Sequence, residues 1–344
     1  MHTKQTVFQF MLNSMRTIVV IGIVFLMLTG CSTRKDRFIN RAYHQTTTKY
    51  NVLFNGNEAL DQAVKAQVEA HQPNFWERLP IDPFPLPDIY DTDAPPNPNY
   101  TLAETKAVAA VQKHSMLIDG TQRNKQIDEA YMLLGKARFY NGRYLQAIEA
   151  FNYIIDQLTN SSSIHAAQLW RAKAYLQLKQ EARAANELTN LINVGSLSMK
   201  EQAVARANQV TAFLALDSLQ KATTPLQKAI YLEKNNNLVA RYAYILGQLY
   251  DQLGYNDSAT VAYQRVIDLN RKIPRSFWIH AKINQLNSSS RPELSITEAY
   301  EDLIKNDENK RFLDKIYFSK AVFHLEHGDT LSTESLLNKS LRTN

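Results

Sequence analysis

The sequence of 344 residues contains one cysteine, Cys31, and therefore no pair of thiols for a disulfide or a thiolate metal site. Glycine is also scarce, with 10 residues in the whole chain. Proline is unevenly placed, because eight of the 11 prolines lie between Pro73 and Pro98. These shortages favour a helical chain that is interrupted by one special segment.

A strong excess of charge is absent as well. The net charge of +6 falls to 37 − 33 = +4 when residues 1–30 are left out, because they contain Lys4, Arg16 and no acidic residue. A mild charge without a concentrated basic stripe is weak support for nucleic-acid binding. We therefore expect no nucleic-acid partner.

Motifs of catalysis are missing too: the chain has no G-x-S-x-G, no phosphate-binding glycine loop and no H-E-x-x-H. His324 and His327 are spaced as half of a metal site on a helix, but no third ligand accompanies them, and His324 occupies an aromatic packing position. We interpret both as packing or surface residues. The sequence predicts no enzyme, catalytic residue, cofactor, metal or small-molecule substrate.

The position of Cys31 suggests a different use. It follows an apolar run, 18–28, that has the length of a signal peptide and is too short for a bilayer span of about 20 residues. The residues Leu28-Thr29-Gly30-Cys31 resemble the bacterial lipobox, which predicts that 1–30 is removed and that Cys31 becomes an acylated first residue. The alternative, a signal anchor over 7–28, is disfavoured by the polar residues inside that span.

Two stretches, 130–151 and 242–263, share one spacing of small and aromatic residues. Leu134-Gly135 matches Leu246-Gly247, Gly142 matches Gly254, Ala147 matches Ala259, and Phe151 matches Tyr263. This spacing resembles the tetratricopeptide repeat (TPR), in which two antiparallel helices pack through small residues opposite large ones. Gly135 and Gly247 are therefore expected to let the two helices of each pair approach closely.

Weaker copies occupy 166–188, 205–234, 274–304 and 316–341, so the step between copies is about 37 residues. Pro225 is expected near the start of its helix, where a missing N–H is tolerated. The predicted fold class is an all-α, TPR-type helical solenoid over 101–344, preceded by an N-terminal helix pair and a proline-rich extended strap.

The N-terminal part, 31–71, is expected to form the helix pair with its turn at Asn55-Gly56 and with Ala59 and Val64 packed inward. The segment 72–100 cannot be helical, because closely spaced prolines remove hydrogen-bond donors and fix φ. It is either a linker or a strap along the helices. The strap is favoured by large apolar residues within it, namely Phe75, Trp76, Ile81, Phe84, Leu86, Ile89 and Tyr90.

The repeat array predicts a surface for partner proteins, because helix A of each repeat lines a concave face. The candidate partner-binding residues in the first and fourth repeats are Met132, Lys136, Phe139, Tyr140, Arg241, Tyr244, Gln248, Asp251 and Gln252. Three Asp-Ser or Asp-Thr tripeptides begin at Asp217, Asp257 and Asp329, between helices A and B. They suit helix capping, and they also resemble acceptors for O-glycosylation in Bacteroidota.

The stretches 42–60 and 107–155 resemble the start of the PorW/SprE family, TPR lipoproteins of Bacteroidota associated with type IX secretion and gliding motility. The resemblance implies a lipid-anchored outer-membrane protein that faces the periplasm and binds other components of the type IX apparatus. Ser32 and the basic residues after it, in place of an acidic cluster, agree with a periplasmic location.

Two other interpretations stay open. A BamD-like lipoprotein of outer-membrane β-barrel assembly would also be a periplasmic TPR array, although the proline-rich strap is not part of such a generic array. An envelope hydrolase with a TPR arm would require a catalytic constellation that this sequence does not display.

Overall fold

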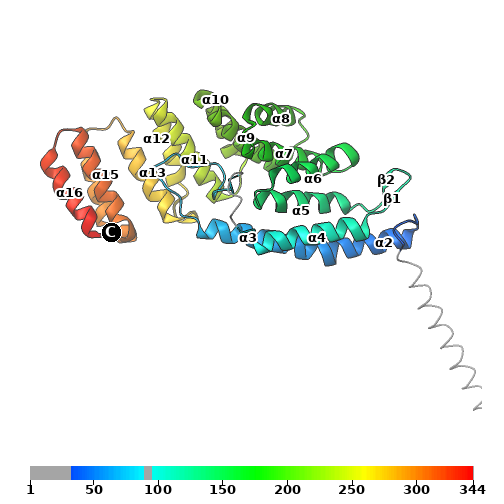
Figure 1. Ribbon diagram of the computed structural model, residues 1–344. Coiled ribbons are helices and arrows are strands. Elements are labelled where there is room, and N and C mark those ends of the chain that lie inside the picture. The colour runs from blue at the N-terminus through cyan, green and yellow to red at the C-terminus, as the bar shows by residue number, and fades with distance from the viewer. Residues whose placement is uncertain (1–31, 89–94, 344) are drawn as a thin grey trace, which may run out of the picture. The chain divides into compact units, whose positions relative to one another are not determined.

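A computed structural model of the chain describes residues 32–88 and 95–343. The chain divides into two compact units, Met1–Gln67 with Leu86–Gln177 and Val68–Pro85 with Leu178–Asn344. Helices dominate both units (Figure 1), so the predicted all-α, TPR-type fold with an extended strap is confirmed. The predicted signal peptide and Cys31 lie outside the described residues. Within the described ranges, no helix is long and apolar enough to cross a bilayer.

The first unit contains a long N-terminal helical run, a β-hairpin and the first helix pairs. Its elements are α2 (Phe38–Thr47), the π-helix η1 (Thr48–Leu53), α3 (Phe54–Ala70), α4 (Pro98–His114), β1 (Leu117–Ile118), β2 (Thr121–Gln122), α5 (Ile127–Tyr140), α6 (Tyr144–Gln157) and α7 (Ile164–Gln177). The hairpin strands are antiparallel, with Leu117 opposite Gln122.

The predicted turn at Asn55-Gly56 is wrong, because α2, η1 and α3 follow one another as one helical run. Gly56 is buried inside this run, where an added Cβ would lie 2.6 Å from Cδ2 of Leu133 on α5. Gly56 therefore allows α5 to approach the helical run closely, and it does not form a turn. Ala59 is buried as predicted, and Val64 is partly buried against the same core.

The π-helix keeps one face of the run buried. Asn40, His44, Thr48 and Leu53 are all buried, and the steps between them are four, four and five residues. The five-residue step crosses η1, whose turns are wider than those of an α-helix. His44 on this face lies beside His114 of α4, with their Nδ1 atoms 2.9 Å apart.

The second unit continues the series of helix pairs. Its elements are α8 (Glu181–Asn193), α9 (Met199–Ala215), α10 (Leu219–Leu232), α11 (Asn236–Gln252), α12 (Asn256–Ile267), the 3-10 helix η2 (Asn270–Lys272), α13 (Arg275–Asn287), α14 (Glu293–Lys305), the 3-10 helix η3 (Asp307–Phe312), α15 (Leu313–Glu326) and α16 (Thr330–Thr343). Tyr242, Tyr244 and Tyr263 are in its main hydrophobic core.

The turns between helices A and B reproduce the predicted period. Five of these turns have one residue with positive φ: Gly142 (+75°), Lys179 (+57°), Asp217 (+51°), Gly254 (+75°) and Gly328 (+82°). The turn between α13 and α14 has none. Successive positions are 37, 38, 37 and 74 residues apart. The second repeat lacks the glycine and places Lys179 in the left-handed conformation instead, which costs a side chain some strain.

The predicted close approach of helices A and B is confirmed in both strong repeats. A Cβ added at Gly135 would overlap the ring of Phe151, and one added at Gly247 would overlap the ring of Tyr263. Both rings are fully buried. Glycine is thus required where an aromatic ring crosses the helix backbone.

Pro225 is not near the start of its helix, contrary to expectation. It is the seventh residue of α10 and lies beyond the first turn. Only in the first turn do the backbone N–H groups have no acceptor within the helix, so that a missing N–H costs nothing there. Pro225 is buried, on the same helix as the core residues Ala222, Leu226 and Ala229.

Candidate functional site

The strap, here residues 72–85, lies along α11 and α13 of the second unit (Figure 1). Three of its side chains, Phe75, Leu79 and Ile81, are buried in the core that also contains Tyr244 and Phe277. The strap is therefore an integral part of the second unit. It occupies the helix-A side of the fourth repeat in the manner of a bound peptide.

The face of α11 that holds the strap consists of Arg241, Tyr244, Gln248 and Gln252, which we call the strap face. Arg241 donates from Nη1 to the carbonyl of Pro80 (3.0 Å) and from Nη2 to that of Pro83 (3.3 Å). The Tyr244 hydroxyl donates to the carbonyl of Phe75 (3.3 Å).

Gln248 binds the strap backbone with both ends of its amide. Its Oε1 accepts a hydrogen bond from the N–H of Leu79 (3.0 Å), and its Nε2 donates to the carbonyl of Glu77 (2.7 Å). Arg78 of the strap also donates to Oε1 of Gln252 (3.2 Å). Most of these bonds involve the strap main chain, so the strap face can bind extended peptides of varied sequence.

Phe75 anchors the strap through its ring. It stacks on His280 with centroids 4.1 Å apart, and it packs edge-on against Phe277 (4.9 Å) and Tyr244 (5.3 Å). Trp76, the next residue, is about half exposed and lies beside a cleft of about 940 Å³ that is also lined by Phe277, Phe312 and Lys315. The strap thus forms one wall of an aromatic cleft.

The electrostatics of the site follow from burial. Desolvation lowers the pKa of the Arg241 guanidinium, an effect that the carboxylate of Asp82 opposes, and the group remains charged at neutral pH. Burial also lowers the pKa of His280 to about 4. His280 is therefore neutral at pH 7, and its Nδ1–H donates to the carbonyl of Ser276 (2.7 Å).

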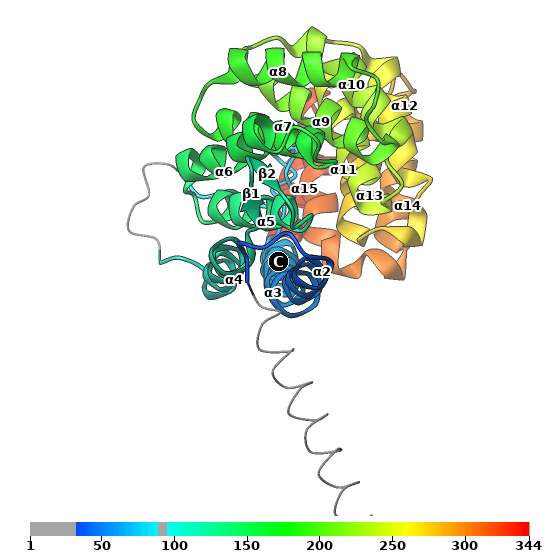
Figure 2. The ribbon, with the colours of Figure 1, turned by 90° about the vertical axis from the view of Figure 1, so that its right-hand side faces the viewer.

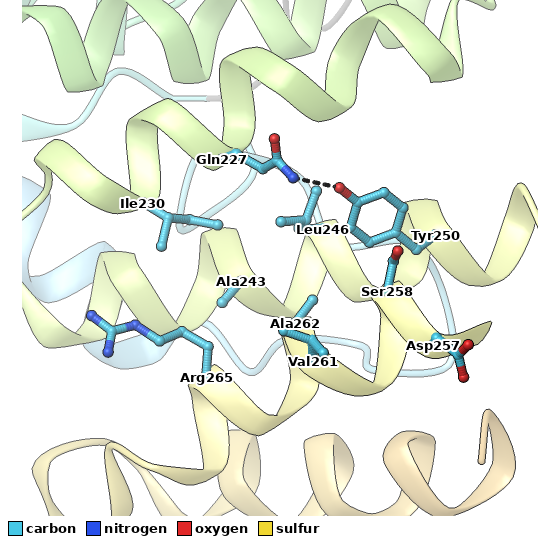
Figure 3. A pocket seen from close by; sticks show the side chains of 10 residues that line it. All are labelled: Gln227, Ile230, Ala243, Leu246, Tyr250, Asp257, Ser258, Val261, Ala262 and Arg265. Carbon is cyan, nitrogen blue, oxygen red and sulfur yellow. Dashed lines mark hydrogen bonds between the residues drawn. The ribbon is translucent and has the colours of Figure 1, made fainter. Parts of the chain in front are cut away.

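A second concavity lies on the helix-B side of the same repeats, between α10, α11 and α12 (Figure 3). This helix-B cleft has a volume of about 490 Å³, and apolar side chains such as Leu246, Ile230 and Val261 line it. At one end Gln227 donates to the Tyr250 hydroxyl (2.7 Å). No strap residue lines this cleft.

The candidate residues of the first repeat include two that are core residues, which corrects the prediction for them. Met132 and Phe139 are buried, and Phe139 packs edge-on against Trp170 of α7. Tyr140 is partly buried and stacks on Tyr100 of α4. Lys136 is partly exposed, with its ammonium 5.4 Å from the centroid of the Trp170 ring.

The candidates of the fourth repeat divide differently. Arg241, Tyr244, Gln248 and Gln252 all contact the strap, so the predicted partner surface is covered by the chain itself. Asp251 has a structural role, since its carboxylate accepts hydrogen bonds from the hydroxyls of Tyr263 (2.6 Å) and Ser288 (2.6 Å). Burial raises the pKa of Asp251 and these hydrogen bonds oppose that rise.

The Asp-Ser and Asp-Thr tripeptides were expected to cap the N-terminus of helix B. One of the three does so. Asp329 accepts a hydrogen bond from the N–H of Ser332 at the start of α16 (3.0 Å). Ser218 instead donates to the carbonyl of Leu216 (3.2 Å), and Asp257 lies inside the first turn of α12.

His324 is buried, with Nδ1 3.2 Å from a carboxylate oxygen of Asp329, and His327 donates to the carbonyl of Phe323 (2.7 Å). Within residues 32–88 and 95–343, no group of three or more His, Cys, Asp and Glu side chains could hold a metal ion.

The sequence did not reveal Phe277 and His280 of α13 as strap contacts, nor the helix-B cleft. Phe277 and His280 are three residues apart, so their spacing puts them on one helix face. That spacing does not indicate that the ring of Phe75 packs against both of them.

A family model described as "Tetratricopeptide repeat" matches residues 240–273, which contain most of α11 and all of α12. A search of curated proteins finds no match.

Among solved structures, the chain is similar to MamA, with 19% identity, 61% of this chain and 94% of that chain covered, and a TM-score of 0.37. It is similar to the apo form of RapI, with 12% identity, coverage of 90% and 87%, and a TM-score of 0.49. It is also similar to a thermophilic TPR protein of Thermus thermophilus, with 18% identity, coverage of 55% and 91%, and a TM-score of 0.37.

Proposed function

We propose that this protein is a lipid-anchored scaffold of the bacterial outer membrane that faces the periplasm and binds components of the type IX secretion machinery through its TPR-type array. The scaffold role is supported by one observation above all: the array holds an extended segment of its own chain on the strap face. The anchor is supported by the lipobox-like residues that end at Cys31, and the secretion role by the resemblance of the N-terminal half to the PorW/SprE family.

The binding mode follows from the chemistry of the two surfaces. The strap occupies Arg241 and Gln248, so an extended peptide of a partner would reach these main-chain-binding groups only by displacing the strap. The helix-B cleft is open and apolar, and it suits an aliphatic or aromatic side chain of a partner protein. We assign no catalytic step to either surface.

The test is a crosslinked pull-down of the tagged, acylated protein from Bacteroidota envelopes, followed by mass spectrometry, with Cys31→Ala as the control for anchoring. Enrichment of type IX components supports the proposal. Enrichment of β-barrel assembly components instead would replace it with the BamD-like role.

A charge in the helix-B cleft sharpens this test. Val261 is 71% exposed, so Val261→Glu leaves the core intact while it places a carboxylate in the apolar cleft. Leu331→Glu is the matched control, because Leu331 is 83% exposed on α16, away from the residues that line this cleft. Loss of the captured proteins in the first variant only assigns partner binding to the cleft.

A further inference from the structure

The N-terminal helical run carries a row of large apolar side chains that are exposed to solvent. These are Phe38 (77% exposed), Ile39 (65%), Tyr43 (43%), Tyr50 (61%) and Phe54 (62%), which together we call the N-terminal face. Single exposed apolar residues are ordinary on protein surfaces, but a contiguous set indicates an interaction site.

The row runs along the exposed side of this helical run. Ile39 and Tyr43 are about one α-helical turn apart on α2, while Tyr50 lies in η1 and Phe54 begins α3, so the wider π-helical turn spreads these side chains over the exposed side of the run. The opposite face is buried, with α4 beside the run (Figure 2). Hydrogen bonds fix this orientation: Asn124 donates to the Thr48 hydroxyl (3.0 Å), and Gln45 donates to the carbonyl of Arg123 (3.2 Å). The N-terminal face is therefore held outward.

Positive charge accompanies these apolar residues. Between residues 32 and 58 there are five cations and two acids, a local charge of 5 − 2 = +3. Arg34, Lys35, Arg37 and Lys49 are exposed. Asp36 is neutralised within the structure, since its carboxylate pairs with Arg41 (2.8 Å) and with Arg123 (3.1 Å).

We propose that the N-terminal face lies in the headgroup region of an anionic lipid surface, with its aromatic rings at the boundary of the acyl chains and its cations on the lipid phosphates. Tyrosine and phenylalanine flanked by lysine and arginine are the composition of helices that lie in the plane of a membrane interface.

The inference rests on the lipid anchor that belongs to the proposed function. Six residues separate Cys31 from Phe38, and even a fully extended chain of that length spans only about 25 Å. An acylated Cys31 would hold Phe38, where the N-terminal face begins, within that distance of the lipid surface, so that weak interfacial binding of the face becomes effectively intramolecular. The face would then fix the orientation of the first unit on the membrane.

The test uses the single natural cysteine. Once Cys31 is acylated, the chain has no free thiol, so Phe38→Cys, Tyr50→Cys and Phe54→Cys can each carry one nitroxide label. The full-length acylated protein is reconstituted in phosphatidylglycerol-containing vesicles, and collisions of the label with oxygen and with a water-soluble nickel chelate are measured. Tyr231→Cys is the control, because Tyr231 is 88% exposed on α10.

Labels on the N-terminal face should gain oxygen collisions and lose nickel collisions on vesicles, while the label at position 231 stays aqueous. Neutralising Arg34, Lys35, Arg37 and Lys49 to glutamine should return the labels toward water, by roughly fivefold in surface occupancy for each cation.

Labels that remain as aqueous as the control on vesicle-bound, acylated protein would overturn the inference. Protection in native envelopes without protection on protein-free vesicles would also overturn it, and would assign the face to a protein partner. The mass of the purified protein is measured first. A protein without acyl groups would contradict the predicted lipid anchor, and the inference would fail with it. The mass of the protein identifies this outcome independently of the label collisions.

Discussion

Replacing Phe75 with alanine should release the strap from the array. Phe75 is 7% exposed and its ring contacts those of Tyr244, Phe277 and His280. Removing a buried phenylalanine costs about 3 kcal/mol or more, from lost burial and lost aromatic contacts. Since every 1.4 kcal/mol is a factor of ten, the population with an undocked strap should rise roughly 100-fold.

Limited trypsin digestion measures this opening, because Arg78 lies in the middle of the strap and is cleaved only when the backbone there is free. The rate of cleavage after Arg78, followed by mass spectrometry, should rise by about two orders of magnitude in Phe75→Ala. Phe75→Leu is the control and should change the rate far less, because it keeps most of the apolar volume. Equal cleavage rates in the wild type and in Phe75→Ala would refute the claim that the Phe75 ring holds the strap on the array.

Three further predictions concern packing and pH. Gly247→Ala should lower the free energy of unfolding by about 1–3 kcal/mol in urea titrations, because the added Cβ would overlap the ring of Tyr263. The double variant Gly247→Ala/Tyr263→Leu should lose less stability than the sum of the losses in the two single variants. Gly56→Leu should lower the melting temperature measured by circular dichroism, whereas Asn55→Leu, at an exposed helical neighbour, should leave it nearly unchanged. The pKa of His280 is about 4 in the folded chain against 6.5 in the unfolded chain, so the unfolded state binds more protons between these values. Stability should therefore be complete above pH 6.5 and fall by up to about 3 kcal/mol towards pH 4, and His280→Phe should remove this dependence in urea titrations across that range.

The repeat architecture was predictable because it is encoded locally. The leucine-glycine pair at 246–247 and Tyr263 lie within one helix–turn–helix, so their spacing alone specifies which ring crosses which glycine. The period of about 37 residues likewise appears in the turns, where even Lys179 adopts the conformation that glycine has elsewhere.

The turn predicted at Asn55-Gly56 failed because a local signal was overruled by packing. An Asn-Gly pair usually marks a turn, but α5 approaches so closely here that only glycine fits into the helix. The prediction for Pro225 failed as well, since this residue lies buried inside α10 and not at its start.

The candidate site was predicted in part. Of the five residues assigned to the concave side of α11, four contact the strap and Asp251 does not. The apolar residues between the prolines favoured a docked strap, and Phe75, Leu79 and Ile81 are buried in the core of the second unit. That these two predictions describe the two sides of one interface could not be read from the sequence, because Arg241 and Pro80 are 161 residues apart.

The sequence by itself determined the repeat, its period, its turns and its glycine–aromatic seams, since each depends on residues within one helix pair. Only the tertiary structure decided which surface is filled and which is open. The strap covers the helix-A side of the fourth repeat, while the helix-B cleft and the N-terminal face remain exposed. The physical reason is that occupancy depends on which distant segments bury apolar area together, and periodicity along one helix carries no information about that choice.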